Sequence, residues 1–194
     1  MKKKYSYTRF MIIAFFLLTV FLFVFCYFLY RSDDTVSNAT ILVSYSSDSS
    51  LTVDSSMPVT DAVGKQLSFT ADQKKYGYME FSISSNMERV DSVTYEIYLK
   101  EVEENSNLPS DYVKVYLTDG KTDLALDGYQ GNSVPTYQSL KVANSDPGSK
   151  RIYSGILKKD EVKNFKLRVW LKDTYPITTK TRNFEGILYV KVID

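Results

Sequence analysis

The stretch KNFKLRVWLKD, residues 163–173, decides the fold class because apolar and polar residues alternate along it. Successive side chains of a β-strand point to opposite faces of the sheet, so this alternation predicts a strand with one buried face. Trp170 falls on the opposite face, among lysine and arginine residues. The residues expected to point inward are Phe165, Leu167, Val169 and Leu171.

The same period of two recurs in VTYEIYLKE (residues 93–101), DYVKVYL (residues 111–117) and NFEGILYVKVI (residues 183–193). Each is predicted to be a strand that buries alternate residues. The residues expected inward are Tyr95, Ile97, Leu99, Val113, Val115, Leu117, Phe184, Leu188, Val190 and Val192. Weaker strand patterns cover residues 39–45, 66–72, 76–84, 136–143 and 150–157.

Turn-forming residues separate these runs at short intervals. Asp119-Gly120 and Asp146-Pro147-Gly148 have the chemistry that reverses a chain. Many short strands rich in Tyr, Val and Thr are typical of two packed antiparallel sheets. Residues 39–194 are therefore predicted to form an all-β, antiparallel β-sandwich, jelly-roll-like in its arrangement.

The N-terminal part has a different composition, since seven of the 11 phenylalanines lie within residues 10–28. Residues 10–30 carry no charge, and a helix of that length spans roughly 30 Å, the thickness of a bilayer core. The basic residues before it place residues 1–9 in the cytoplasm by the positive-inside bias. We therefore predict a cytoplasmic tail (1–9), one transmembrane helix (10–30), a short polar stalk (31–38) and an extracellular domain.

The anchor is predicted to begin at Phe10, to contain Cys26 and to end at Tyr30, an aromatic residue suited to the membrane interface. A secretory signal has a shorter apolar region followed closely by small residues, whereas the end of this run is bulky. Retention is therefore expected, and cleavage is the alternative. Cys26 is interpreted as one of the apolar residues of the membrane helix, and palmitoylation of its thiol is the alternative.

Charge and composition exclude several classes of function. Residues 1–34 carry five basic and two acidic side chains, a charge of +3, so the whole-chain charge of +1 leaves −2 for residues 35–194. Such a balance offers no electrostatic attraction to nucleic acid. The chain has no histidine, which excludes Ser-His-Asp catalysis and zinc sites built on imidazole. We expect no cofactor and no enzymatic activity.

Two sets of residues are candidates for binding. Asp119, Asp123 and Asp127 are spaced around turns and could supply oxygen ligands to calcium, although solvated turn residues are the simpler interpretation. Tyr98, Tyr116, Trp170 and Tyr189 are expected on outward faces of strands, where aromatic rings can stack on sugars or form a protein interface. In the alternative interpretation, a loop or the second sheet covers Trp170.

The segments that follow the apolar segment are, in order, ILVSY, MPVTDAVGKQLSF, YGYMEFSISSN, TYEIYL, LPSDYVKVYLTDG and FKLRVWLKDTY. In the order of these segments, the chain resembles exported β-sandwich proteins of Gram-positive bacteria related to TasA and camelysin. The resemblance covers most of residues 40–193. It implies a surface or biofilm fibre subunit whose copies are joined by exchange of an N-terminal strand. The first segment departs from that family, whose members carry a short cleavable signal.

These observations together predict a membrane-anchored, non-catalytic structural or interaction protein of the cell surface, with a protein partner or self-assembly. The alternatives are a carbohydrate-binding module that uses the outward aromatic residues, a secreted fibre subunit released by signal cleavage, and an enzyme that relies on carboxylates. Residues 39–45 are expected to pair within their own domain, although an exposed sheet edge can accept a strand from another chain.

Overall fold

The structure is a computed structural model of the chain, and it describes residues 11, 15–23, 39–46, 49–54, 58–68, 76–88, 90–126, 133–144, 146–177 and 179–193. The chain divides into two compact units, Met1–Asn38 and Ala39–Asp194. Each unit is described by itself.

In the first unit, residues 15–23 are helical and their side chains are exposed. No helix built by the described residues is both long enough and apolar enough to cross a membrane. The predicted anchor residues Phe10, Cys26 and Tyr30 lie outside the described residues, as do the predicted tail and stalk. The transmembrane helix therefore stays a prediction.

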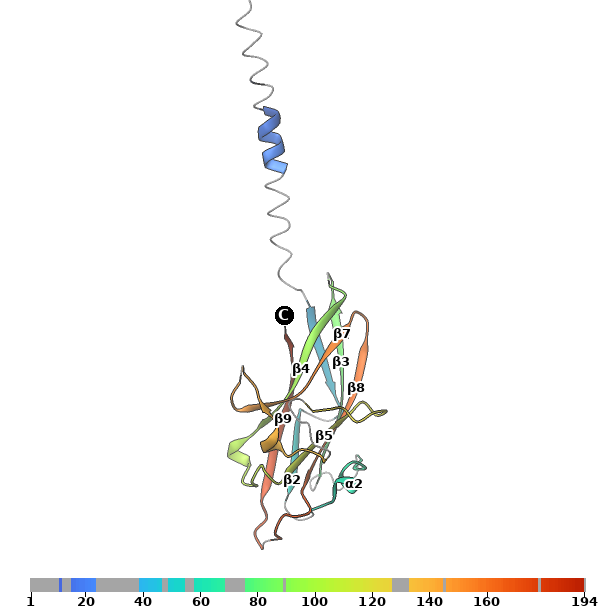
Figure 1. Cartoon of the computed structure of the whole chain (residues 1–194), viewed down its shortest axis with the longest axis vertical. Helices are drawn as coiled ribbons and strands as arrows, with labels where there is room; N and C mark the ends of the chain where they lie inside the picture. Colours follow the sequence, from blue (N-terminus) through green and yellow to red (C-terminus); the bar gives the residue numbers. More distant parts are fainter. Residues whose placement is uncertain are drawn as a thin grey trace, which may run out of the picture. The chain divides into compact units, whose positions relative to one another are not determined.

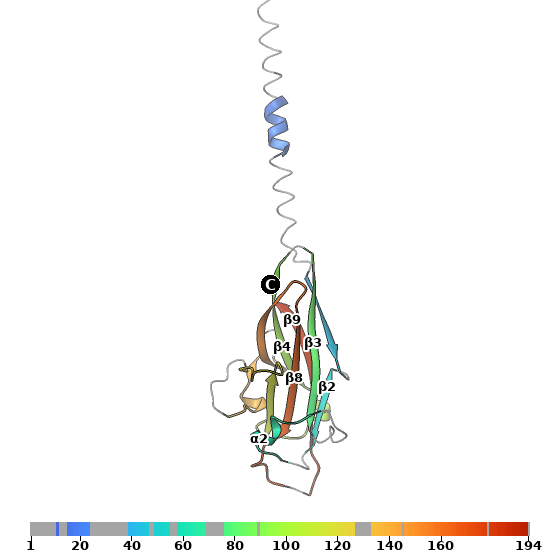
Figure 2. The ribbon, with the colours of Figure 1, turned by 90° about the vertical axis from the view of Figure 1, so that its right-hand side faces the viewer.

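The second unit is a β-sandwich, as Figures 1 and 2 show. One antiparallel sheet has four strands in the order β1-β3-β8-β5, and the other has five in the order β2-β9-β4-β7-β6. The strands are β1 (Ala39–Tyr45), β2 (Ser50–Asp54), β3 (Gly77–Met87), β4 (Ser92–Glu101), β5 (Val113–Thr118), β6 (Lys141–Val142), β7 (Ser149–Lys158), β8 (Val162–Leu171) and β9 (Asn183–Ile193). The short helices are α2 (Asp61–Gly64) and two 3-10 turns, Glu103–Asn105 and Tyr137–Ser139. The prediction of an all-β antiparallel fold is confirmed.

The core lies between the two sheets and contains the residues that the period of two predicted. The inward residues of β8 and β4 are all buried there, as are those of β5 and two of the four expected from β9. The other two, Val190 and Val192, are partly buried against the same cluster. Burying one face of each strand in this way removes apolar area from water, which is the main stabilising contribution to such a fold.

The weaker strand patterns have mixed outcomes. Residues 39–45 form β1, which pairs with β3 of its own domain as expected. Strands also form within residues 76–84 and 150–157. Residues 136–143 instead contain a 3-10 turn and only a two-residue strand, because Thr136 and Ser139 bond each other's backbone as a capping box. In the pattern at 66–72, the described residues form no strand.

Candidate functional site

The four outward aromatic residues do not form one exposed face. Tyr116 and Trp170 lie on the four-stranded sheet, with ring centroids 6.3 Å apart, whereas Tyr98 and Tyr189 stack on the five-stranded sheet at 5.1 Å. Trp170 has no exposed surface, Tyr98 is 2% exposed and Tyr116 is 8% exposed. Only Tyr189 is half-buried. This corrects the expectation of a single binding face.

A loop covers Trp170, as the alternative interpretation held. Gly64 at the end of α2 lies directly against the indole ring, and Val59 and Leu67 pack on the same cluster. The Lys65 carbonyl accepts a hydrogen bond from the Arg168 guanidinium of β8, which holds the loop to the sheet. The sequence did not identify which loop would cover Trp170, because the loop and the strand lie far apart along the chain.

Two of the three aspartates proposed as calcium ligands, Asp119 and Asp123, bind groups of the chain itself. Asp119 accepts hydrogen bonds from the backbone N–H groups of Lys121 and Thr122, which lower the pKa of its carboxyl. Asp123 lies 2.7 Å from the Lys65 ammonium. Asp127 lies outside the described residues. Within the described part of the chain, no three acidic or cysteine side chains gather in a way that could hold a metal ion.

The sandwich is open on one side, where the outer strands of both sheets end early. β5 pairs with β8 only as far as Lys166, so residues 162–165 of β8 are paired on the β3 side alone. β6 pairs with β7 only at Lys150 and Arg151. Among the described strands, none therefore covers the outer edges of β7 and β8 beyond these points.

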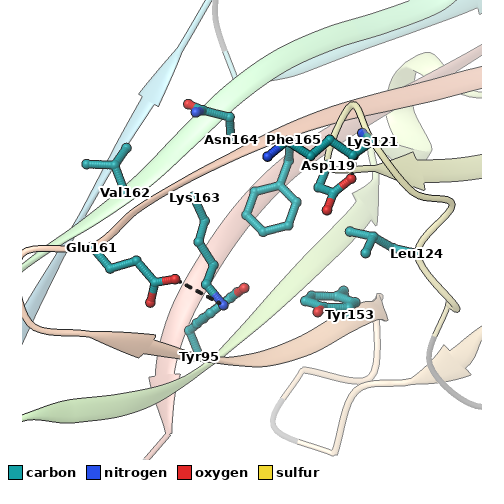
Figure 3. A pocket seen from close by; sticks show the side chains of 10 residues that line it. All are labelled: Tyr95, Asp119, Lys121, Leu124, Tyr153, Glu161, Val162, Lys163, Asn164 and Phe165. Carbon is teal, nitrogen blue, oxygen red and sulfur yellow. Dashed lines mark hydrogen bonds and ion pairs between the residues drawn. The ribbon is translucent and has the colours of Figure 1, made fainter.

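A cavity of about 350 Å³ lies at this opening (Figure 3). Phe165 and Lys163 extend from β8 toward Tyr95 of β4 and Tyr153 of β7. The turn after β5 closes another side. The lining residues are Tyr95, Asp119, Lys121, Leu124, Tyr153, Glu161, Val162, Lys163, Asn164 and Phe165.

Three aromatic rings form the floor of this cavity. The Tyr153 and Phe165 centroids are 6.0 Å apart, those of Tyr95 and Tyr153 are 6.3 Å apart, and those of Tyr95 and Phe165 are 6.4 Å apart. Their planes are inclined by 45° to 65°, so the rings make a corner and not a stack. The alternation in sequence placed Tyr95 and Phe165 in the core, but it could not show that the core is open at this point.

Tyr95 carries a buried polar group without a hydrogen-bond partner. Its side chain has no exposed surface, and among the described residues nothing pairs with its hydroxyl. Burial, together with the nearby Tyr153 and Glu161, raises the pKa of this phenol, so Tyr95 stays protonated and able to donate. Unpaired buried hydroxyls are rare because they lose their hydrogen bonds to water.

The charges around the cavity balance. Asp119 and Glu161 carry negative charge, whereas Lys121 and Lys163 carry positive charge. Lys163 donates to the Ile156 carbonyl at 2.7 Å, and its ammonium lies 3.8 Å from the Glu161 carboxylate. The arrangement therefore offers aromatic surface and polar groups without a net charge.

Comparison with protein-family models gives no match for this chain, and comparison with curated proteins gives none either.

Proposed function

We propose that the protein is a non-catalytic structural and interaction module, held at the outer surface of a cell membrane by residues 10–30. In this proposal, copies of the domain assemble through an open edge of the four-stranded sheet. The resemblance to fibre-forming exported proteins supports the same role.

The observation that carries the proposal is the outer edge of β1. This strand is seven residues long and contains no charged residue and no proline. It is the last strand of its sheet, and Leu42 in its middle is 56% exposed. Edge strands usually carry charged residues, prolines or bulges that prevent pairing with other chains. β1 has neither a charged residue nor a proline.

The opposite edge of the same sheet is protected. The Val115 N–H of β5 donates to the Pro135 carbonyl at 3.0 Å, and the Leu124 N–H donates to the Leu117 carbonyl at 3.0 Å. Loops of the same chain therefore form hydrogen bonds with backbone groups at the outer edge of β5. The contrast supports β1 as the edge that accepts another chain.

The jelly-roll-like arrangement is also part of the proposal. The chain changes sheets at every connection between consecutive strands except that between β6 and β7. Jelly rolls, which pack two antiparallel sheets, are common in proteins that assemble into shells and bind at surfaces.

The proposal predicts that full-length chain in detergent micelles forms oligomers in a concentration-dependent way, measured by analytical ultracentrifugation. Leu42→Lys places a charge on the open strand and should raise the dissociation concentration at least about tenfold. Ile177→Lys is the matched control, because Ile177 is an exposed apolar residue, 77% accessible, on a loop. A wild-type chain that stays monomeric, or equal effects of the two variants, would contradict the role of β1.

A further inference from the structure

We infer that the cavity between β7 and β8 is a binding site for a neutral sugar residue. The site is separate from the β1 edge used in the proposed function. It also differs from the outward aromatic residues first expected to bind sugars, three of which are buried.

The shape of the cavity fits a ligand of this size. A volume of about 350 Å³ lies at the lower end of the range typical for small-molecule sites. Tyr153 is half-buried, so part of its ring faces the opening. Aromatic rings beside a few placed polar groups are the usual lining of such sites, and a sugar ring can lie on an aromatic face by its C–H groups.

Tyr95, which lines the cavity, supplies an unpaired hydroxyl as a hydrogen-bond donor; this hydroxyl lies beside Gly155 of β7. The Lys163 ammonium lies 5.9 Å from the centroid of the Tyr95 ring and covers it. Lysine side chains are flexible, so a ligand that moves Lys163 aside reaches this hydroxyl. A sugar hydroxyl can then accept the hydrogen bond that Tyr95 lacks in the chain alone.

The charges of the cavity favour a neutral ligand over an ion. Asp119 is occupied by backbone N–H groups of its own turn. Glu161 accepts from the Lys158 N–H at 2.9 Å and neutralises Lys163. The exposed Asn164 amide remains to donate and accept at the rim. A charged ligand would add a charge that the balanced lining does not compensate, whereas a neutral ligand that moves Lys163 aside leaves the two acidic and two basic side chains of the lining in balance.

The test is saturation-transfer NMR on full-length chain in a detergent without a sugar headgroup. Glucose and N-acetylglucosamine are the neutral probes, and glucuronate and glucosamine are their charged counterparts. We expect at least one neutral probe to bind with a Kd on the order of 1 mM, and both charged probes to bind more weakly.

Two variants locate the binding. Tyr95→Phe removes only the hydroxyl and should weaken binding about 3- to 10-fold, without lowering the Tm, because it removes an unpaired buried group. Tyr153→Ala removes the ring at the opening and should abolish detectable binding. Tyr112→Phe, outside the cavity, is the matched control and should bind as wild type.

Several outcomes would overturn the inference. These are no transfer from either neutral probe, tighter binding of a charged probe, and equal affinity of the wild type and Tyr95→Phe. Since Leu42 lies outside the cavity, oligomerisation and sugar binding can fail independently.

Discussion

At the scale of single residues, Gly64 packs directly against the indole ring of Trp170. A Cβ atom at Gly64 would lie 2.2 Å from the Trp170 indole Cε2, well inside van der Waals contact. The indole is fully buried and cannot turn away. We therefore expect Gly64→Ala to lower the free energy of unfolding by about 1–3 kcal/mol. Urea unfolding, followed by the fluorescence of the single tryptophan, measures this change.

The matched control is Gly148→Ala. A Cβ there would meet its nearest atom, the Asp146 Oδ1, at 3.6 Å, which is an ordinary contact. The free energy of unfolding should change by less than about 0.5 kcal/mol. An equal loss in the two variants would show that the contact with Trp170 has no special cost.

The burial of Trp170 also shows what sequence patterns can predict for a residue. The alternation in residues 163–173 correctly separated Trp170 from the inward residues of the strand. It could not show what lies on the outer face, because α2 is more than a hundred residues away in the chain. The identity of Gly64 is explained only when the two segments are seen in contact.

At the scale of elements, α2 is tied to the sheet by a partly buried ion pair. The Lys114 ammonium of β5 lies 3.5 Å from Asp61 Oδ1, and it also donates to the Val134 carbonyl. The other oxygen of Asp61 accepts from the Val134 N–H at 3.0 Å. One carboxylate therefore joins α2 to both β5 and the segment that covers the edge of β5.

Asp61→Asn should destabilise the domain, because it leaves the ammonium of Lys114 buried without its counter-charge. The Lys114 side chain is only 8% exposed, whereas that of Asp61 is 33% exposed, so the expected loss is about 1–3 kcal/mol. In the double variant with Lys114→Met, the loss should be smaller than the sum of the single losses by at least about 0.5 kcal/mol. Chemical denaturation of the four proteins measures the coupling, and purely additive losses would contradict it.

The long strands were the elements that the sequence predicted well. In β8 and β4, alternation extends over ten residues, and one apolar face is enough to fix both strand and orientation. Residues 136–143 were misassigned because side-chain hydrogen bonds of Thr136 and Ser139 outweigh a short alternating pattern. Local capping of this kind is decided by geometry that a strand pattern does not contain.

At the scale of the whole domain, the important feature is where the strands stop. β5 ends before its partner β8 does, and β6 ends before its partner β7 does, which leaves the core open at Tyr95, Tyr153 and Phe165. The sequence predicted most of the strands but not their partners, so neither the cavity nor the position of β1 at the edge of its sheet could be located from it. Pairing depends on contacts between distant segments.

The proposed anchoring of the chain in a membrane by residues 10–30 can be tested on the intact protein. Residues 10–30 are uncharged, and the run ends in bulky residues instead of the small ones that a signal peptidase needs. We expect intact-mass measurements on the native host to find the full-length 22.3 kDa chain in washed membranes and none in the medium. A released species that begins near Thr40 would contradict anchoring. It would leave assembly through β1 intact, and the secreted fibre subunit would then become the leading interpretation.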